Sequence, residues 1–102
     1  MKNKIIAVDF DGTLCENAWP NIGAPRTDVI ERLKQEQREG AKVILWTCRV
    51  GEALTAAVYW CIKHGLLFDA INENLIETMK EYGSEARKIS ATEYWDDRAV
   101  LP

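Results

Sequence analysis

Two pairs of aspartates are the residues most able to do chemistry together. Asp9 and Asp11 lie in the segment DFDGTL near the N-terminus, and Asp96 and Asp97 lie in the segment WDD near the C-terminus. Carboxylates gathered a few ångströms apart cannot all ionise without compensation. A hard cation with oxygen ligands supplies that compensation, and Mg²⁺ with part of its water shell suits a site that also receives phosphate. The acids therefore predict a Mg²⁺ site, provided that the fold brings them together.

The chain alternates predicted strands and helices around these acids. Apolar, β-branched runs predict buried parallel strands at 4–10, 41–47 and 66–71, with a short strand at 93–95. Helices are expected at 28–39 with Thr27 as N-cap, at 52–64, and over a short stretch at 74–82. The Asn-, Gly- and Pro-rich segment 15–25 predicts a loop. This alternation predicts an α/β fold, a Rossmann-like three-layer sandwich with a mainly parallel sheet, as a single domain over 1–102.

Parallel α/β sheets bind ligands beyond the carboxyl ends of their strands. Asp9 and Asp11 end the first predicted strand, Thr47 and Arg49 end the second, and Asp96–Asp97 end the last. We expect all of them to meet at one edge of the sheet. Thr47 alone could equally be a strand-end hydroxyl bonded to the backbone.

Arg49 has two interpretations: a bidentate grip on substrate phosphate, or an ion pair with Glu52, three residues further on. Lys88 lies among polar residues, so by itself it also fits an ordinary solvated charge.

The order of these segments resembles that of the haloacid dehalogenase superfamily. DFDGTL (Asp9 to Leu14) is similar to the family's first motif, and VILWTCR (Val43 to Arg49) resembles the second. Lys88 stands where the third motif has its lysine, and WDD (Trp95 to Asp97) resembles the fourth. The resemblance spans nearly the whole chain, and it implies a Mg²⁺-dependent phosphatase.

The resemblance also implies a role for each matching residue. Asp9 would be the nucleophile that forms an aspartyl-phosphate, and Asp11 would protonate the leaving oxygen and then deprotonate water. Gly12 would turn the chain sharply, with its N–H facing the phosphate. Thr47 would donate to a phosphate oxygen, and Lys88 would balance the charge on Asp9 and the phosphoryl group.

For the metal, the resemblance implies a ligand set made of Asp9, the main-chain carbonyl of Asp11, and the Asp96–Asp97 pair. Which member of that pair binds directly is left open by the sequence.

The intervals between the motifs have no room for the inserted cap domain of larger family members. A capless site suits a large substrate, or a small one covered by another subunit. The four tryptophans, and Trp19 with Pro20 just after the first motif, supply apolar contacts for such a partner. We therefore expect a homodimer.

The composition narrows the function classes further. The net charge of −3 gives no basic footprint, so a phosphorylated small molecule is favoured over nucleic acid. The alternatives are a polynucleotide-end phosphatase and a non-catalytic phosphate- or partner-binding module on the same fold. The three cysteines lack CxxC spacing, which indicates a reducing cytoplasm, and no apolar stretch is long enough to predict a membrane helix.

Overall fold

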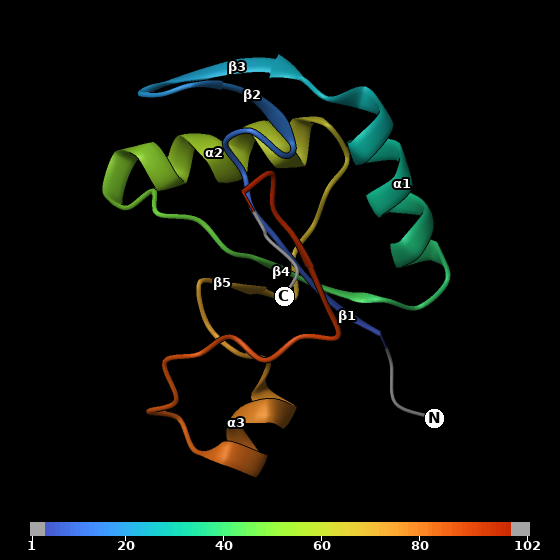
Figure 1. Ribbon diagram of the computed structural model, residues 1–102, viewed down its shortest axis with the longest axis vertical. Coiled ribbons are helices and arrows are strands. Elements are labelled where there is room, and N and C mark those ends of the chain that lie inside the picture. The colour runs from blue at the N-terminus through green and yellow to red at the C-terminus, as the bar shows by residue number, and fades with distance from the viewer. Residues whose placement is uncertain (1–3, 99–102) are drawn as a thin grey trace.

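A computed structural model describes residues 4–98 of the 102-residue chain, and Figure 1 shows its central parallel sheet. The strands are β1 (Ile5–Val8), β4 (Lys42–Leu45), β5 (Ala70–Ile71) and β6 (Glu93–Trp95), in the order β5-β4-β1-β6. Val8 is paired with Leu45 on one side and with Trp95 on the other, so three strands end level with one another. The α/β expectation with a parallel sheet is confirmed.

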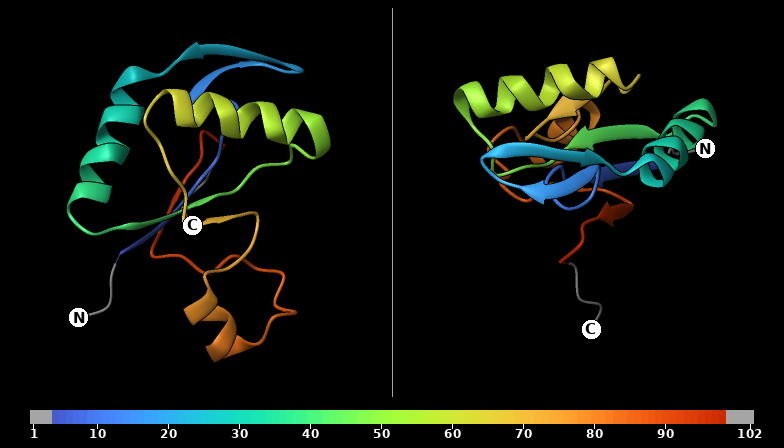
Figure 2. Two further views of the ribbon diagram at one scale, coloured as in Figure 1. Left: turned by 180° about the vertical axis from the view of Figure 1, so that it is seen from behind. Right: turned by 90° about the horizontal axis from the view of Figure 1, so that it is seen from above.

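Helices cover both faces of the sheet. The larger core cluster joins Ile6 and Val8 to the helices α1 (Thr27–Arg38) and α2 (Gly51–Lys63). Ala7 points to the opposite face, as strand alternation requires, and packs in a smaller cluster that includes Leu75 at the start of α3 (Ile76–Tyr82). Figures 1 and 2 show α3 across the sheet from the other two helices. The three-layer arrangement is thus confirmed.

The strand order explains where a ligand site can form. From β1 the chain passes through α1 to β4 and through α2 to β5, always moving the same way across the sheet, and then returns to β6 on the other side of β1. The order therefore reverses beside β1. Crevices at such switch points, beyond the carboxyl ends of the strands, are where open α/β sheets bind ligands.

The segment predicted as a loop at 15–25 is instead an antiparallel hairpin, β2 (Cys15–Ala18) and β3 (Asn21–Pro25), and this prediction was wrong. Figure 2 shows it as a separate ribbon outside the main sheet. A Cβ atom on Gly23 would lie 2.1 Å from the carbonyl oxygen of Glu16, so glycine here permits close approach of the two strands. A residue that usually indicates a loop is therefore part of a strand pair.

Two further expectations need correction. Thr27 is the first residue of α1 rather than its N-cap, and Arg26, which precedes it, makes no side-chain capping bond. The strand expected at 66–71 shrinks to Ala70–Ile71, because Leu66 is buried in the core of α1 and α2 and its N–H donates to the Cys61 carbonyl. Within residues 4–98, no helix is long and apolar enough to cross a membrane.

Candidate active site

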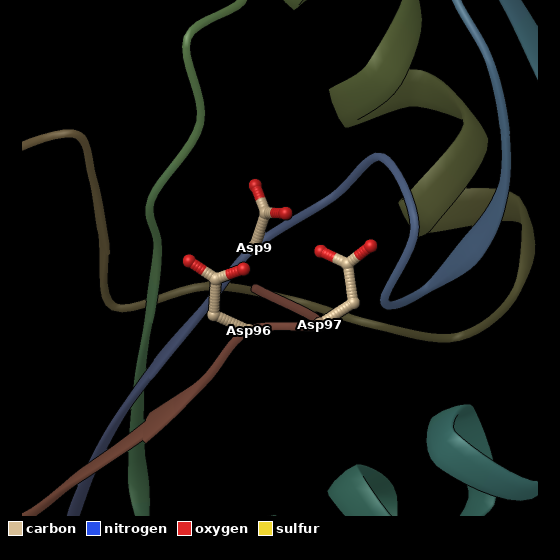
Figure 3. A group of neighbouring side chains, drawn as sticks. All are labelled: Asp9, Asp96 and Asp97. Carbon is tan, nitrogen blue, oxygen red and sulfur yellow. The ribbon is translucent and has the colours of Figure 1, made fainter. Parts of the chain in front are cut away.

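Three aspartates from opposite ends of the chain meet at the switch point. Asp9 follows β1, and Asp96 and Asp97 follow β6; one carboxylate oxygen from each lies within 4.8 Å of the others. Figure 3 shows the three carboxylates turned toward a common space. The strand pairing accounts for this, because the Asp9 N–H donates to the Trp95 carbonyl at 2.9 Å and ties the two strand ends together.

The electrostatics of this cluster favour a cation. Burial raises the pKa of Asp9 from 3.8 to about 6, the N–H of Phe10 opposes that rise, and the charges of Asp96, Asp97 and Asp11 add to it. A bound divalent cation would remove the repulsion that these carboxylates exert on one another. Carboxylate oxygens are also the donors that Mg²⁺ prefers. The residues present therefore fit the metal that the sequence predicts.

Gly12 lets the loop after β1 approach the acids closely. Its φ is +89°, and a Cβ atom there would lie 2.3 Å from Oδ2 of Asp97. The Asp97 N–H donates to Oγ1 of Thr13 at 3.2 Å, which joins the same two loops a second time. The sharp turn expected at Gly12 is confirmed. Its N–H, however, donates to the Cys15 carbonyl at 2.9 Å, so the expectation that it faces phosphate was wrong.

Gly12→Ala is therefore expected to weaken Mg²⁺ binding at least about tenfold, because the added methyl group displaces the Asp97 carboxylate. Gly40→Ala is the matched control: Gly40 also has positive φ, +99°, but a Cβ atom there meets nothing within 4 Å. Both variants should lose about 1 kcal/mol of stability to backbone strain. Calorimetric titration with Mg²⁺ separates the effect of backbone strain, which both variants share, from displacement of Asp97, which only Gly12→Ala causes. Equal Mg²⁺ affinities of the two variants would contradict this role of Gly12.

Arg49 forms a bidentate ion pair with Asp11. Its Nε donates to Oδ2 and its Nη2 to Oδ1, both at 2.8 Å, and this hydrogen bonding raises the pKa of the guanidinium. The Arg49 side chain is only 2% exposed. Its remaining donors reach main-chain carbonyls at 3.4 Å in Pro20, 3.0 Å in Asn21 and 3.5 Å in Ala53.

Neither role expected for Arg49 is found. The guanidinium is not free to grip phosphate, and it pairs with Asp11 rather than with Glu52. Instead, Arg49 joins three segments: the loop after β1, the turn of the β2–β3 hairpin and the start of α2. It is a positioning residue for Asp11. The hairpin whose carbonyls satisfy it was not predicted, so the sequence could not reveal this role.

Thr47 lies at the same edge of the sheet. Its Oγ1 accepts the Arg49 N–H at 3.2 Å, and its own N–H donates to Oδ1 of Asn72 at 2.8 Å. Asn72 adopts a left-handed conformation with φ of 54°, which asparagine tolerates better than most residues. The Thr47 hydroxyl donates to no group within residues 4–98, so its proton can serve a ligand, as the predicted role requires.

Among the residues that the structure describes, no contact brings the Lys88 side chain to the acids. Its main-chain carbonyl accepts a bond from Nδ2 of the buried Asn74 at 2.9 Å, and Oδ1 of Asn74 accepts the Ser90 N–H at 2.7 Å. The Lys88 side chain is exposed and, within residues 4–98, makes no ion pair or hydrogen bond. Its charge-balancing role stays a prediction.

A pocket of about 420 Å³ opens beside this cluster. Five predicted site residues line it: Asp9, Asp11, Thr47, Arg49 and Asp96. Its lining also includes Asn17, Trp19, Cys48 and Arg98, which were not predicted as site residues. A basic residue directly after the second acid pair was a usable signal for Arg98. Trp19 was expected near the site entrance because it follows the first motif closely, but as a contact for a second subunit rather than as part of the pocket. Asn17 belongs to β2 of the hairpin, and its approach to the acids had no signal in the sequence.

Comparison with known proteins gives one informative match. No family model and no curated protein matches the chain significantly. The solved structure of a conserved protein coded by a locus of Bacteroides thetaiotaomicron matches with a TM-score of 0.86 and 41% sequence identity. The match covers 99% of this chain and 83% of that one. The chain therefore belongs to the same protein family as this conserved Bacteroides protein.

Proposed function

We propose that the protein is a Mg²⁺-dependent phosphomonoesterase of the haloacid dehalogenase type. The observation that carries the proposal is the convergence of Asp9, Asp96 and Asp97 at the switch point of the sheet. These acids belong to the DFDGTL and WDD segments that resemble the family's first and fourth motifs. A cluster of acids on an arbitrary surface would not have this motif order, this strand-end placement and an adjoining pocket.

The proposed reaction has two displacements on phosphorus. In the first, a carboxylate oxygen of Asp9 attacks phosphorus while the bond to the leaving oxygen breaks, which gives an aspartyl-phosphate and the free alcohol or phenol. In the second, water attacks phosphorus, the bond to Asp9 breaks, and inorganic phosphate leaves. Both transition states require mainly positioning and charge stabilisation.

Asp11 is the proposed acid and base for these steps. It would give a proton to the leaving oxygen in the first displacement and take one from water in the second. Each of its carboxylate oxygens accepts one bond from Arg49, so the proton would occupy the remaining lone pair of one of them. Leaving groups that depart readily as anions place less demand on this step.

The remaining residues serve the phosphoryl group. Asp9, Asp96 and Asp97 would hold Mg²⁺, which when bound supplies positive charge for the phosphoryl oxygens. The Thr47 hydroxyl would donate to one of those oxygens, and Lys88 is proposed to add positive charge once its exposed side chain reaches the site.

The test is hydrolysis of p-nitrophenyl phosphate by the purified protein. We expect turnover with Mg²⁺, complete loss after treatment with a chelator, and recovery when excess Mg²⁺ is added, because the three clustered carboxylates would otherwise repel the phosphate dianion. Activity that survives full metal removal would contradict the metal assignment. Mg²⁺ binding without turnover of any phosphate ester would support a non-catalytic binding module instead.

A further inference from the structure

Trp19 has an exposed side chain at the turn of the β2–β3 hairpin. It is 58% exposed, and it lines the same pocket as Asp9 and Thr47. A large aromatic side chain left in water beside a pocket is a feature of ligand-binding surfaces. Among the described residues that line this pocket, Trp19 is the aromatic one.

The Trp19 ring is held in place although it is exposed. The guanidinium carbon of Arg49 lies 4.8 Å from the ring centroid, in a cation–π arrangement. The same guanidinium donates to the carbonyls of Pro20 and Asn21, the two residues that follow Trp19. The main-chain N–H of Trp19 donates to Oδ1 of Asn17 at 3.3 Å. A surface fixed in this way loses little conformational entropy when a ligand packs on it.

Other exposed aromatic side chains do not share this setting. Trp46 packs against Tyr94, with ring centroids 5.6 Å apart. Tyr59 lies on α2 and Tyr82 on α3, and neither lines the pocket. Exposure alone therefore does not single out Trp19; its fixation beside the candidate nucleophile does.

We propose that Trp19 is a stacking surface for a planar ring of the substrate, and that the substrates are small phosphomonoesters carrying such a ring, as nucleoside monophosphates do. This inference rests on the proposed phosphatase function. The phosphate would lie at Asp9 while the base stacks on the indole, and Asn17 and Arg98 supply polar partners along the pocket. A volume of about 420 Å³ lies within the usual range for small-molecule sites.

The test compares adenosine 5′-monophosphate with ribose 5-phosphate, which carries the same phosphate ester on the same sugar without the base. For the wild type we expect kcat/KM to be higher for the nucleotide. Trp19→Ala should lower this preference about tenfold, mainly through KM for the nucleotide, because base–aromatic stacking is lost. Trp19→Phe, which keeps an aromatic face, should retain most of the preference. Tyr82→Ala, at a side chain 65% exposed on α3, is the matched control and should keep the wild-type ratio.

Several outcomes would overturn the inference. One is a wild-type enzyme with no preference for the nucleotide. Another is a Trp19→Ala variant whose kcat/KM falls equally for both substrates, since Trp19 would then only support the hairpin or a subunit contact. Thermal unfolding of each variant identifies a folding defect. If Trp19→Ala is misfolded, the ratio of kcat/KM for the nucleotide to kcat/KM for ribose 5-phosphate, measured in the wild type and in Trp19→Phe, tests the inference. Absence of turnover for both substrates and for p-nitrophenyl phosphate would instead refute the proposed function.

Discussion

Replacing Asp9 with asparagine is expected to lower phosphatase turnover at least about a thousandfold while leaving the fold intact. The amide has nearly the shape of the carboxylate, but it cannot attack phosphorus or contribute an anionic ligand to the metal. Steady-state hydrolysis of p-nitrophenyl phosphate measures the loss, and circular dichroism checks the fold. Substantial turnover, with mass spectrometry excluding deamidation back to aspartate, would contradict the covalent mechanism.

The same variant is expected to be more stable than the wild type without metal at neutral pH. The pKa of Asp9 is about 6 in the folded protein against an ordinary value of 3.8, so the folded state binds this proton more tightly than the unfolded state does. The protonated Asp9 side chain therefore stabilises the folded state fully below about pH 3.8, and this stabilisation is lost as the pH rises through about 6. Above that range the wild type bears a partly buried charge that asparagine lacks. After allowance for solvent screening, the difference should be about 1 kcal/mol.

Urea unfolding in the presence of chelator at pH 4 and pH 7.5 tests this expectation. The free energy of unfolding of Asp9→Asn should exceed that of the wild type at the higher pH, and the gap should shrink at the lower pH. Glu85→Gln, at an exposed carboxylate away from the cluster, is the control and should show no such dependence. A gap that does not change with pH would mean that the Asp9 charge is not the cause.

Arg49→Met is expected to lower the free energy of unfolding by about 3 kcal/mol. Methionine fills part of the volume but removes both hydrogen bonds to Asp11 and those to the hairpin carbonyls. The Asp11 carboxylate, which is 19% exposed, then loses its counter-ion. Breaking a buried pair from one side is costly, because the other charge stays behind without compensation.

Chemical unfolding of Arg49→Met, of Asp11→Asn and of the double variant measures the coupling between the two residues. The double variant should be less destabilised than the sum of the single variants. Arg38→Met is the matched control, since Arg38 is exposed and its side chain donates to Gln35 on the same helix. If Arg49→Met costs no more than Arg38→Met, the ion pair does not contribute to stability.

The sheet and the position of the acids could be predicted from the sequence. Runs such as KIIAVDF and AKVILWT are apolar and rich in β-branched residues on both faces, a pattern typical of a strand buried between two layers. Once the strands are parallel, residues that follow them must collect at one edge. This is why Asp9 and Asp96–Asp97 could be predicted as one cluster from opposite ends of the chain.

The surroundings of that cluster depend on contacts between segments that lie apart in the sequence. The hairpin at Cys15–Pro25 has no alternating pattern, and its close strand approach at Gly23 is visible only when Glu16 lies opposite. The partner of Arg49 depends on that hairpin, since its turn supplies two of the carbonyls that satisfy the guanidinium. The spacing of apolar residues along the chain indicates which face of a helix or strand is buried, because each buried position favours an apolar residue whatever its exact neighbours are. The hydrogen-bond partners of a buried charge, in contrast, are the groups that folding brings close enough to take the place of water, and these can come from any part of the chain.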